Sequence, residues 1–116
     1  MWASGCNTFD VAAIYGGGEC ECVLGNWISS RQINRDELVV ITKGGCEGQD
    51  KLWKANFGDK DTILLSLKSS LQRLQIEYID SYLLHRDDES IPINEVVDFM
   101  SELVNLGLVE TWGVSN

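Results

Sequence analysis

Short hydrophobic runs alternate along the chain with longer segments whose hydrophobic residues recur every three or four positions. The short runs are typical of strands, and the longer spacing is typical of amphipathic helices. Four strands are therefore predicted, at residues 7–10, 38–42, 78–84 and 109–114. The β-branched character of residues 38–42 predicts a strand that is buried on both faces.

Three helices are predicted between these strands. The first spans residues 19–30, the second follows Asp59 or Asp61 as a capping residue, and the third lies between Pro92 and Gly107. Residues 43–58 are predicted to form a long loop that contains glycine. The first helix is indicated by the helical spacing of Val23, Leu24, Trp27 and Ile28. The second has an apolar stripe of Ile63, Leu67, Leu71 and Leu74, and the core face of the third is predicted to hold Val96, Val97, Met100, Leu103 and Val104.

This alternation of strands and helices predicts βαβ units, and hence an α/β fold with a parallel sheet. The length of 116 residues is enough for one modest domain with a core of its own. No linker and no low-complexity tract divides the chain.

Ionisable side chains of different kinds stand at or just after the ends of three consecutive predicted strands. They are Asp10, Lys43 and His85, and Tyr15 follows Asp10 by five positions. Each has an ordinary structural explanation when taken alone, since a strand-end lysine usually reaches water and a single histidine is usually structural. Parallel strand ends, however, meet at one edge of a sheet, where ligands bind. Their common position therefore predicts a shared crevice.

The four side chains suit one kind of chemistry. Lys43 would pair with Asp10 and lie near the Tyr15 hydroxyl, where an ammonium favours the phenolate and makes Tyr15 a usable general acid. His85 would hydrogen-bond a substrate carbonyl oxygen. These groups fit the protonation step of carbonyl reduction, and the hydride must come from a cofactor because no side chain donates one.

Three further residues each have two interpretations. Trp53 could line an apolar substrate pocket or merely anchor its loop. Ser115 and Asn116 could form a simple turn or hydrogen-bond an amide such as a nicotinamide carboxamide.

The glycines at 16–18 match no phosphate-loop spacing and predict a flexible loop, while Glu19 and Glu21 suit the dipole of the next helix. Asp80 interrupts an apolar strand and is interpreted as a structural carboxylate that needs a partner.

The charge balance limits the partners. The formal net charge is −9 and no basic cluster occurs, which argues against nucleic acid and anionic membrane surfaces. No hydrophobic run is long enough for a membrane span, and residues 1–10 lack the pattern of a signal peptide. The spacing of the four cysteines predicts no metal site, and reduced thiols in a cytoplasmic protein are expected.

The chain resembles the aldo-keto reductases over nearly its whole length. The matching segments are GCNTFDVAAIYGGGE, VVITKGG, SLKSSLQRLQIEYIDSYLLHRDD and LVNLGLVETWGVSN, and their order matches too. The resemblance implies a (β/α)₈ barrel that binds NADPH, or less often NADH, and a small carbonyl substrate. It also implies that Tyr15 donates the proton, that Asp10 and Lys43 tune it, that His85 positions the carbonyl, and that Ser115 and Asn116 hold the carboxamide.

The length is the main departure from that family, because a full barrel takes about 250 residues. Residues 1–116 resemble the second to fifth strands, so an incomplete barrel domain is expected, with about four parallel strands and three helices. The loops that grip the cofactor's phosphates would lie outside it. Exposed strand edges predict self-association. Besides a reductase, the resemblance leaves open a nucleotide-sensing subunit of the channel β-subunit type and an inactive fragment.

Overall fold

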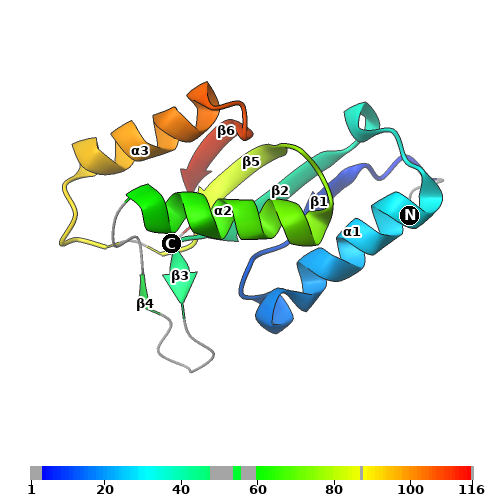
Figure 1. Ribbon diagram of the computed structural model, residues 1–116, viewed down its shortest axis with the longest axis horizontal. Coiled ribbons are helices and arrows are strands. Elements are labelled where there is room, and N and C mark those ends of the chain that lie inside the picture. The colour runs from blue at the N-terminus through cyan, green and yellow to red at the C-terminus, as the bar shows by residue number, and fades with distance from the viewer. Residues whose placement is uncertain (1–3, 48–53, 56–59, 87, 116) are drawn as a thin grey trace.

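The computed structural model describes residues 4–47, 54–55, 60–86 and 88–115. Its main sheet has four parallel strands in the order β1-β2-β5-β6. These strands are β1 (Thr8–Asp10), β2 (Val39–Gly44), β5 (Ile79–Leu84) and β6 (Val109–Val114). Three helices alternate with them, namely α1 (Glu19–Arg31), α2 (Lys60–Leu74) and α3 (Ile93–Asn105). Figure 1 shows this arrangement, which confirms the predicted fold class of four parallel strands and three helices.

Shorter elements complete the order along the chain. Two 3₁₀ turns, η2 (Tyr15–Gly18) and η3 (Arg35–Glu37), precede α1 and β2 respectively. Strands β3 (Cys46–Glu47) and β4 (Lys54–Ala55) form a small antiparallel pair after β2. The prediction of a plain loop at 43–58 was wrong in this part, because residues that pair for only two positions leave no periodic signal in the sequence.

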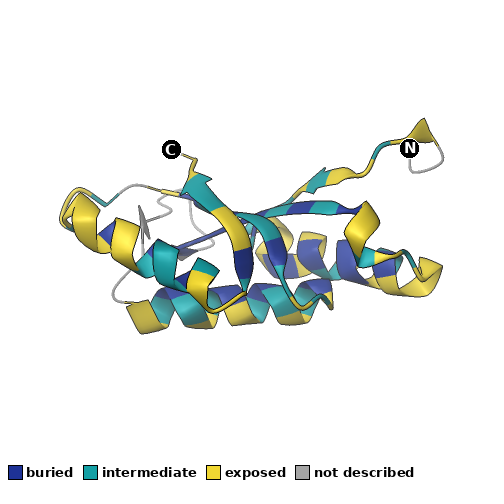
Figure 2. Cartoon of the chain, turned by 90° about the horizontal axis from the view of Figure 1, so that it is seen from above, coloured by how far each residue is buried: buried dark blue, intermediate teal, exposed yellow. Residues whose placement is uncertain are grey.

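The hydrophobic core lies between the sheet and the helices. Figure 2 shows α1, α2 and α3 together on one face of the sheet. Side chains from both layers fill the interface, among them Val40, Ile63, Leu67 and Tyr82, all fully buried. Burial of such side chains is the main stabilising contribution to the layer packing.

The first four residues of β2 alternate in burial, which departs from the sequence prediction. Val40 and Thr42 are buried, whereas Val39 and Ile41 are only half-buried. None of the described helices covers the face on which Val39 and Ile41 lie, so the prediction of burial on both faces was wrong for these two residues. That face would be the barrel interior in a closed (β/α)₈ sheet.

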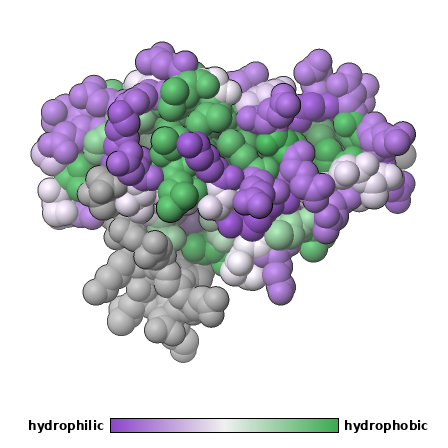
Figure 3. Space-filling view, viewed as in Figure 1, coloured by the Kyte–Doolittle hydropathy of each residue, from purple (hydrophilic) through white to green (hydrophobic). Residues whose placement is uncertain are grey.

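Most, but not all, of the predicted helix faces are buried. Val97, which was expected on the core face of α3, is 41% exposed, and Val23, one of the residues whose spacing predicted α1, is 68% exposed. Each lies beside a residue that is buried instead, Leu24 or Val96, so the apolar stripe is narrower than the spacing suggested. Figure 3 shows hydrophobic side chains surfacing between polar ones on this face of the molecule.

A carboxylate ties the amino end of β5 to the neighbouring strand. Asp80 pairs with Arg35 and accepts a hydrogen bond from the Val40 amide at 2.7 Å. This confirms the structural interpretation of Asp80, because a carboxylate in a strand needs donors of this kind to offset its lost hydration.

Candidate active site

The candidate site lies at the carboxyl ends of β1, β2 and β5, as the sequence predicted. Asp10 is the last residue of β1, Lys43 is the fifth of the six residues of β2, and His85 follows β5 directly. Lys43 therefore belongs to its strand and does not follow it, which corrects the predicted boundary. Its place in the strand fixes its backbone, and its side chain reaches the carboxyl end of β1.

Lys43 joins the first two strands through its ammonium group. The Nζ atom donates hydrogen bonds to Asp10 Oδ1 and to the Val11 carbonyl, the latter at 3.1 Å. Lys43 is buried, at 6% exposure, whereas 57% of the Asp10 side chain is exposed. A buried ammonium needs such partners, so the pair holds Lys43 in one place.

Tyr15 reaches the same place from the turn that precedes α1. The Lys43 Nζ atom lies 5.2 Å from the centre of the Tyr15 ring. The His85 ring meets the Tyr15 ring edge-on, with 5.9 Å between ring centres. Tyr15 is also 37% exposed, so a molecule from solvent can reach it. The structure thus brings together Asp10, Tyr15, Lys43 and His85 at one accessible edge of the sheet.

Neither of the other two tyrosines shares this environment. Tyr82 is fully buried against the helices, and burial raises its pKa to about 12. Tyr78 precedes β5 at the opposite end of the sheet, where the Arg35 guanidinium stacks 4.0 Å from the centre of its ring. Of the three tyrosines in the chain, Tyr15 is the one that a ligand at the strand ends would meet.

His85 is buried and positioned by the sheet. Its amide donates to the Gly44 carbonyl at 2.9 Å, which continues the pairing of β5 with β2. Burial lowers the pKa of the imidazole, the positive charges of Lys43 and Arg86 lower it further, and Asp10 opposes them. A neutral imidazole can both donate and accept a hydrogen bond, which is what a carbonyl-orienting group requires.

Because the pKa of His85 is lowered, we expect the protein to be less stable in mild acid. Below about pH 6.5 the unfolded chain takes up a proton at His85 that the folded chain still excludes. The unfolded state then binds more protons, so the free energy of unfolding falls as pH drops from about 6.5 toward the folded-state pKa. Urea unfolding of the native chain and of His85→Gln across this range should show their stability difference change with pH. A difference that is constant with pH would contradict this expectation.

Ser115 lies next to His85 on the sheet. Its amide donates to the Leu84 carbonyl at 2.8 Å, and the residue is exposed at the end of β6. A hydroxyl in this position can donate to or accept from a carboxamide, so the described part of the predicted carboxamide site fits that group. Asn116 and Trp53, which the sequence also singled out, lie outside the described residues.

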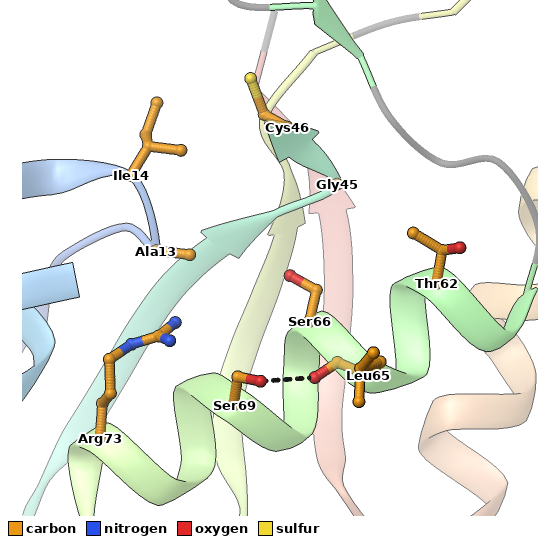
Figure 4. A pocket seen from close by; sticks show the side chains of 9 residues that line it. All are labelled: Ala13, Ile14, Gly45, Cys46, Thr62, Leu65, Ser66, Ser69 and Arg73. Atoms are coloured by element: carbon orange, nitrogen blue, oxygen red, sulfur yellow. Dashed lines mark hydrogen bonds between the residues drawn. The ribbon is translucent and has the colours of Figure 1, made fainter. Parts of the chain in front are cut away.

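A cavity of about 290 Å³ lies beside this site without including any of its four side chains. Figure 4 shows it between α2, which contributes Ser66, Ser69 and Arg73, and the segment that carries Ala13 and Ile14. The half-buried Arg73 contacts the fully buried Glu21, which also contacts the fully buried Thr42, and the sequence analysis missed this polar cluster. Its members are 21 and 52 positions apart, so no local spacing signals their contact.

Within the described ranges, no group of three or more His, Cys, Asp or Glu side chains is arranged to hold a metal ion. No described helix has the length and apolar character that crossing a membrane requires.

Comparison with known proteins gives one consistent result. Residues 2–116 match the model of the aldo/keto reductase family. A Schizosaccharomyces pombe protein, named as a voltage-gated potassium channel subunit beta, is 37% identical over 114 residues, which are 98% of this chain and 33% of that protein. The chain thus spans about a third of the length of that relative.

Two solved structures carry the same fold. An aldo-keto reductase from Bacillus halodurans, in its holo form, is 32% identical with a TM-score of 0.84, over 98% of this chain and 38% of its own. An aldo-keto reductase from Klebsiella pneumoniae in complex with NADPH is 33% identical with a TM-score of 0.76, over 98% of this chain and 36% of its own.

Proposed function

Because the chain belongs to the aldo/keto reductase family, we propose that it carries the proton-transfer site of an NAD(P)H-dependent reductase that converts aldehydes or ketones to alcohols. The observation that carries the proposal is the meeting of the exposed Tyr15 with the Lys43 ammonium and the His85 ring. The chain spans about a third of its relatives, so the activity of the whole enzyme is part of the proposal.

Each residue has a separate role in this proposal. The Tyr15 hydroxyl donates its proton to the carbonyl oxygen as negative charge develops there. The Lys43 ammonium stabilises the phenolate that remains, and Asp10 holds Lys43 in place through their ion pair. The neutral His85 orients the carbonyl oxygen by hydrogen bonding.

The proposed cofactor site on this chain is that of the nicotinamide end. A bound NADPH would supply the hydride. Ser115, next to His85, would hold the carboxamide, with Asn116 beside it in sequence. The Klebsiella pneumoniae structure in complex with NADPH supports this choice of cofactor, and NADH is the alternative. We propose Trp53 as a residue that lines the substrate pocket.

Cofactor binding and turnover can be measured together. The purified chain is mixed with NADPH and an aromatic aldehyde, and the absorbance and fluorescence of the cofactor are followed. A decline in absorbance that depends on both chain and aldehyde supports the reductase. Unchanged absorbance and fluorescence would refute the proposal for this chain.

A second candidate function follows from the Schizosaccharomyces pombe relative, which is named as a channel subunit. In this alternative the chain binds the nucleotide and reports its redox state without rapid turnover. The same experiment separates the two, because a sensor changes the fluorescence of NADPH but leaves its absorbance unchanged when aldehyde is added.

A further inference from the structure

A fully buried carboxylate lies behind the candidate active site, on the helix side of the sheet. Glu21, in the first turn of α1, has no exposed surface. It accepts a hydrogen bond from Thr42 Oγ1 at 2.6 Å and another from Arg73 Nε at 2.6 Å. Arg73 also donates to the buried Ser70 at 3.2 Å. The carboxylate therefore joins α1, α2 and β2 at one point.

The position of this junction along the chain is informative. Thr42 directly precedes Lys43, and Glu21 follows Tyr15 by six residues. Between Tyr15 and Glu21 lie Gly16, Gly17 and Gly18, all with positive φ, which is a backbone conformation that glycine adopts without strain. A segment with three consecutive glycines does not hold a tyrosine ring in place by itself.

The segment is held to β2 at both of its ends. Before Tyr15, the Ala13 amide donates to the Lys43 carbonyl at 2.9 Å. After Tyr15, Glu21 accepts a hydrogen bond from Thr42. Tyr15 thus lies between two attachments to adjacent residues of the same strand.

Arg73 also supports the turn between these attachments. A side chain at Gly18 would place its Cβ 2.9 Å from Arg73 Cδ, so the arginine passes directly against this glycine. Figure 4 shows Arg73 extending from α2 toward the segment that carries Ala13 and Ile14.

We propose that Glu21 is a positioning residue, which fixes Tyr15 against Lys43 and His85 by anchoring the start of α1 to Thr42 and Arg73. The catalytic importance of this positioning rests on the proposed function. The positioning itself is a structural claim that can be tested without measuring turnover. The reason is that a loosened Tyr15 segment changes the contact between two rings whether or not a substrate is converted.

Thr42→Val is the sharpest test, with Thr42→Ser as its matched control. Valine keeps the shape and β-branching that suit a strand but cannot donate to Glu21, whereas serine keeps the hydroxyl. The chain has a single histidine, so its ring protons give one unambiguous set of signals in an NMR spectrum. The readouts are the nuclear Overhauser effect between the Tyr15 and His85 rings and the titration midpoint of His85.

The charged groups around His85 determine the sign of the second readout. Lys43 from β2 and Arg86 next in sequence lower its pKa, Asp10 from β1 raises it, and the Tyr15 ring lies against it. In Thr42→Val the Overhauser effect should weaken and the midpoint should rise, because a displaced Tyr15 admits water to the imidazole. In Thr42→Ser both should remain as in the native chain.

Kinetics add a further readout when kcat is divided by the folded fraction measured by circular dichroism, because a loss of stability alone then leaves kcat unchanged. A misplaced proton donor lowers kcat between about ten- and a hundredfold, while the KM for NADPH stays within about twofold. If the native chain turns over no aldehyde, the proposed function fails, but the NMR comparison still tests the positioning.

The outcomes are distinct. Native-like Overhauser effect and titration midpoint in a folded Thr42→Val chain would overturn the inference even if the native chain is an active reductase. If circular dichroism shows that Thr42→Val does not fold, Glu21→Gln carries the same test. It keeps an acceptor for Thr42, removes the charge that holds Arg73, and should loosen Tyr15 in the same way.

Discussion

Replacing Tyr15 by phenylalanine should lower the rate of carbonyl reduction by about 10²- to 10⁴-fold, which is the usual contribution of a positioned general acid. The ring that packs edge-on against His85 remains, and only the hydroxyl is lost. Because Tyr15 is 37% exposed, the change leaves no buried cavity and should shift the free energy of unfolding by less than about 0.5 kcal/mol. A matching loss in kcat and kcat/KM, measured from NADPH absorbance, is the expected signature.

Tyr78→Phe provides the control for this experiment. Tyr78 carries the same phenol but lies at the other end of the sheet, stacked with Arg35. Its replacement should leave turnover unchanged within about twofold, because no proton is transferred there. Equal activity of the native chain and Tyr15→Phe would show that the proton comes from another group, and the proton-donor role would have to be abandoned.

The fold was predictable because its signals are local. Strand and helix periodicities fixed the order of elements, and the rule that parallel strand ends meet at one edge placed Asp10, Lys43 and His85 together. The structure brings these residues and Tyr15 into contact range, as expected. Burial was harder to predict, because the burial of Val39 and Ile41 depends on which elements cover the sheet and not on the spacing of these residues in the sequence.

The contacts of Glu21 behind the site could not be predicted from the sequence. Glu21 was expected only to suit the helix dipole, and it does lie in the first turn of α1. Its full burial depends on Arg73, 52 positions away, and on Thr42, which looked like an ordinary strand residue. A contact between distant segments has no period, so a buried ion pair of this kind becomes visible only when the helices are placed.

The second large effect is expected where α1 packs against α2. Gly25 lies in α1 where it meets α2, and an added Cβ would lie 2.4 Å from the carbonyl oxygen of Arg73 and 2.7 Å from that of Leu74. Both are backbone atoms, which cannot rotate away as a side-chain end can. Gly25→Ala must therefore push the helices apart.

Two opposing effects determine the size of that change. Alanine is the better helix former by about 1 kcal/mol, which favours the substitution. Overpacking costs about 1–3 kcal/mol and more where backbone must move, and separating the helices also stretches the bond between Glu21 and Arg73. The second effect is larger, so we expect a net loss of about 2 kcal/mol and a fall in Tm on the order of 8 °C.

Val23→Ala is the matched control on the same helix. Val23 is 68% exposed, so its truncation should change stability by no more than about 0.5 kcal/mol. Thermal unfolding followed by circular dichroism compares the two variants with the native chain. A Gly25→Ala chain that melts at or above the native temperature would mean that helix propensity outweighs the contact, and that α1 and α2 are less closely packed than their backbone distances indicate.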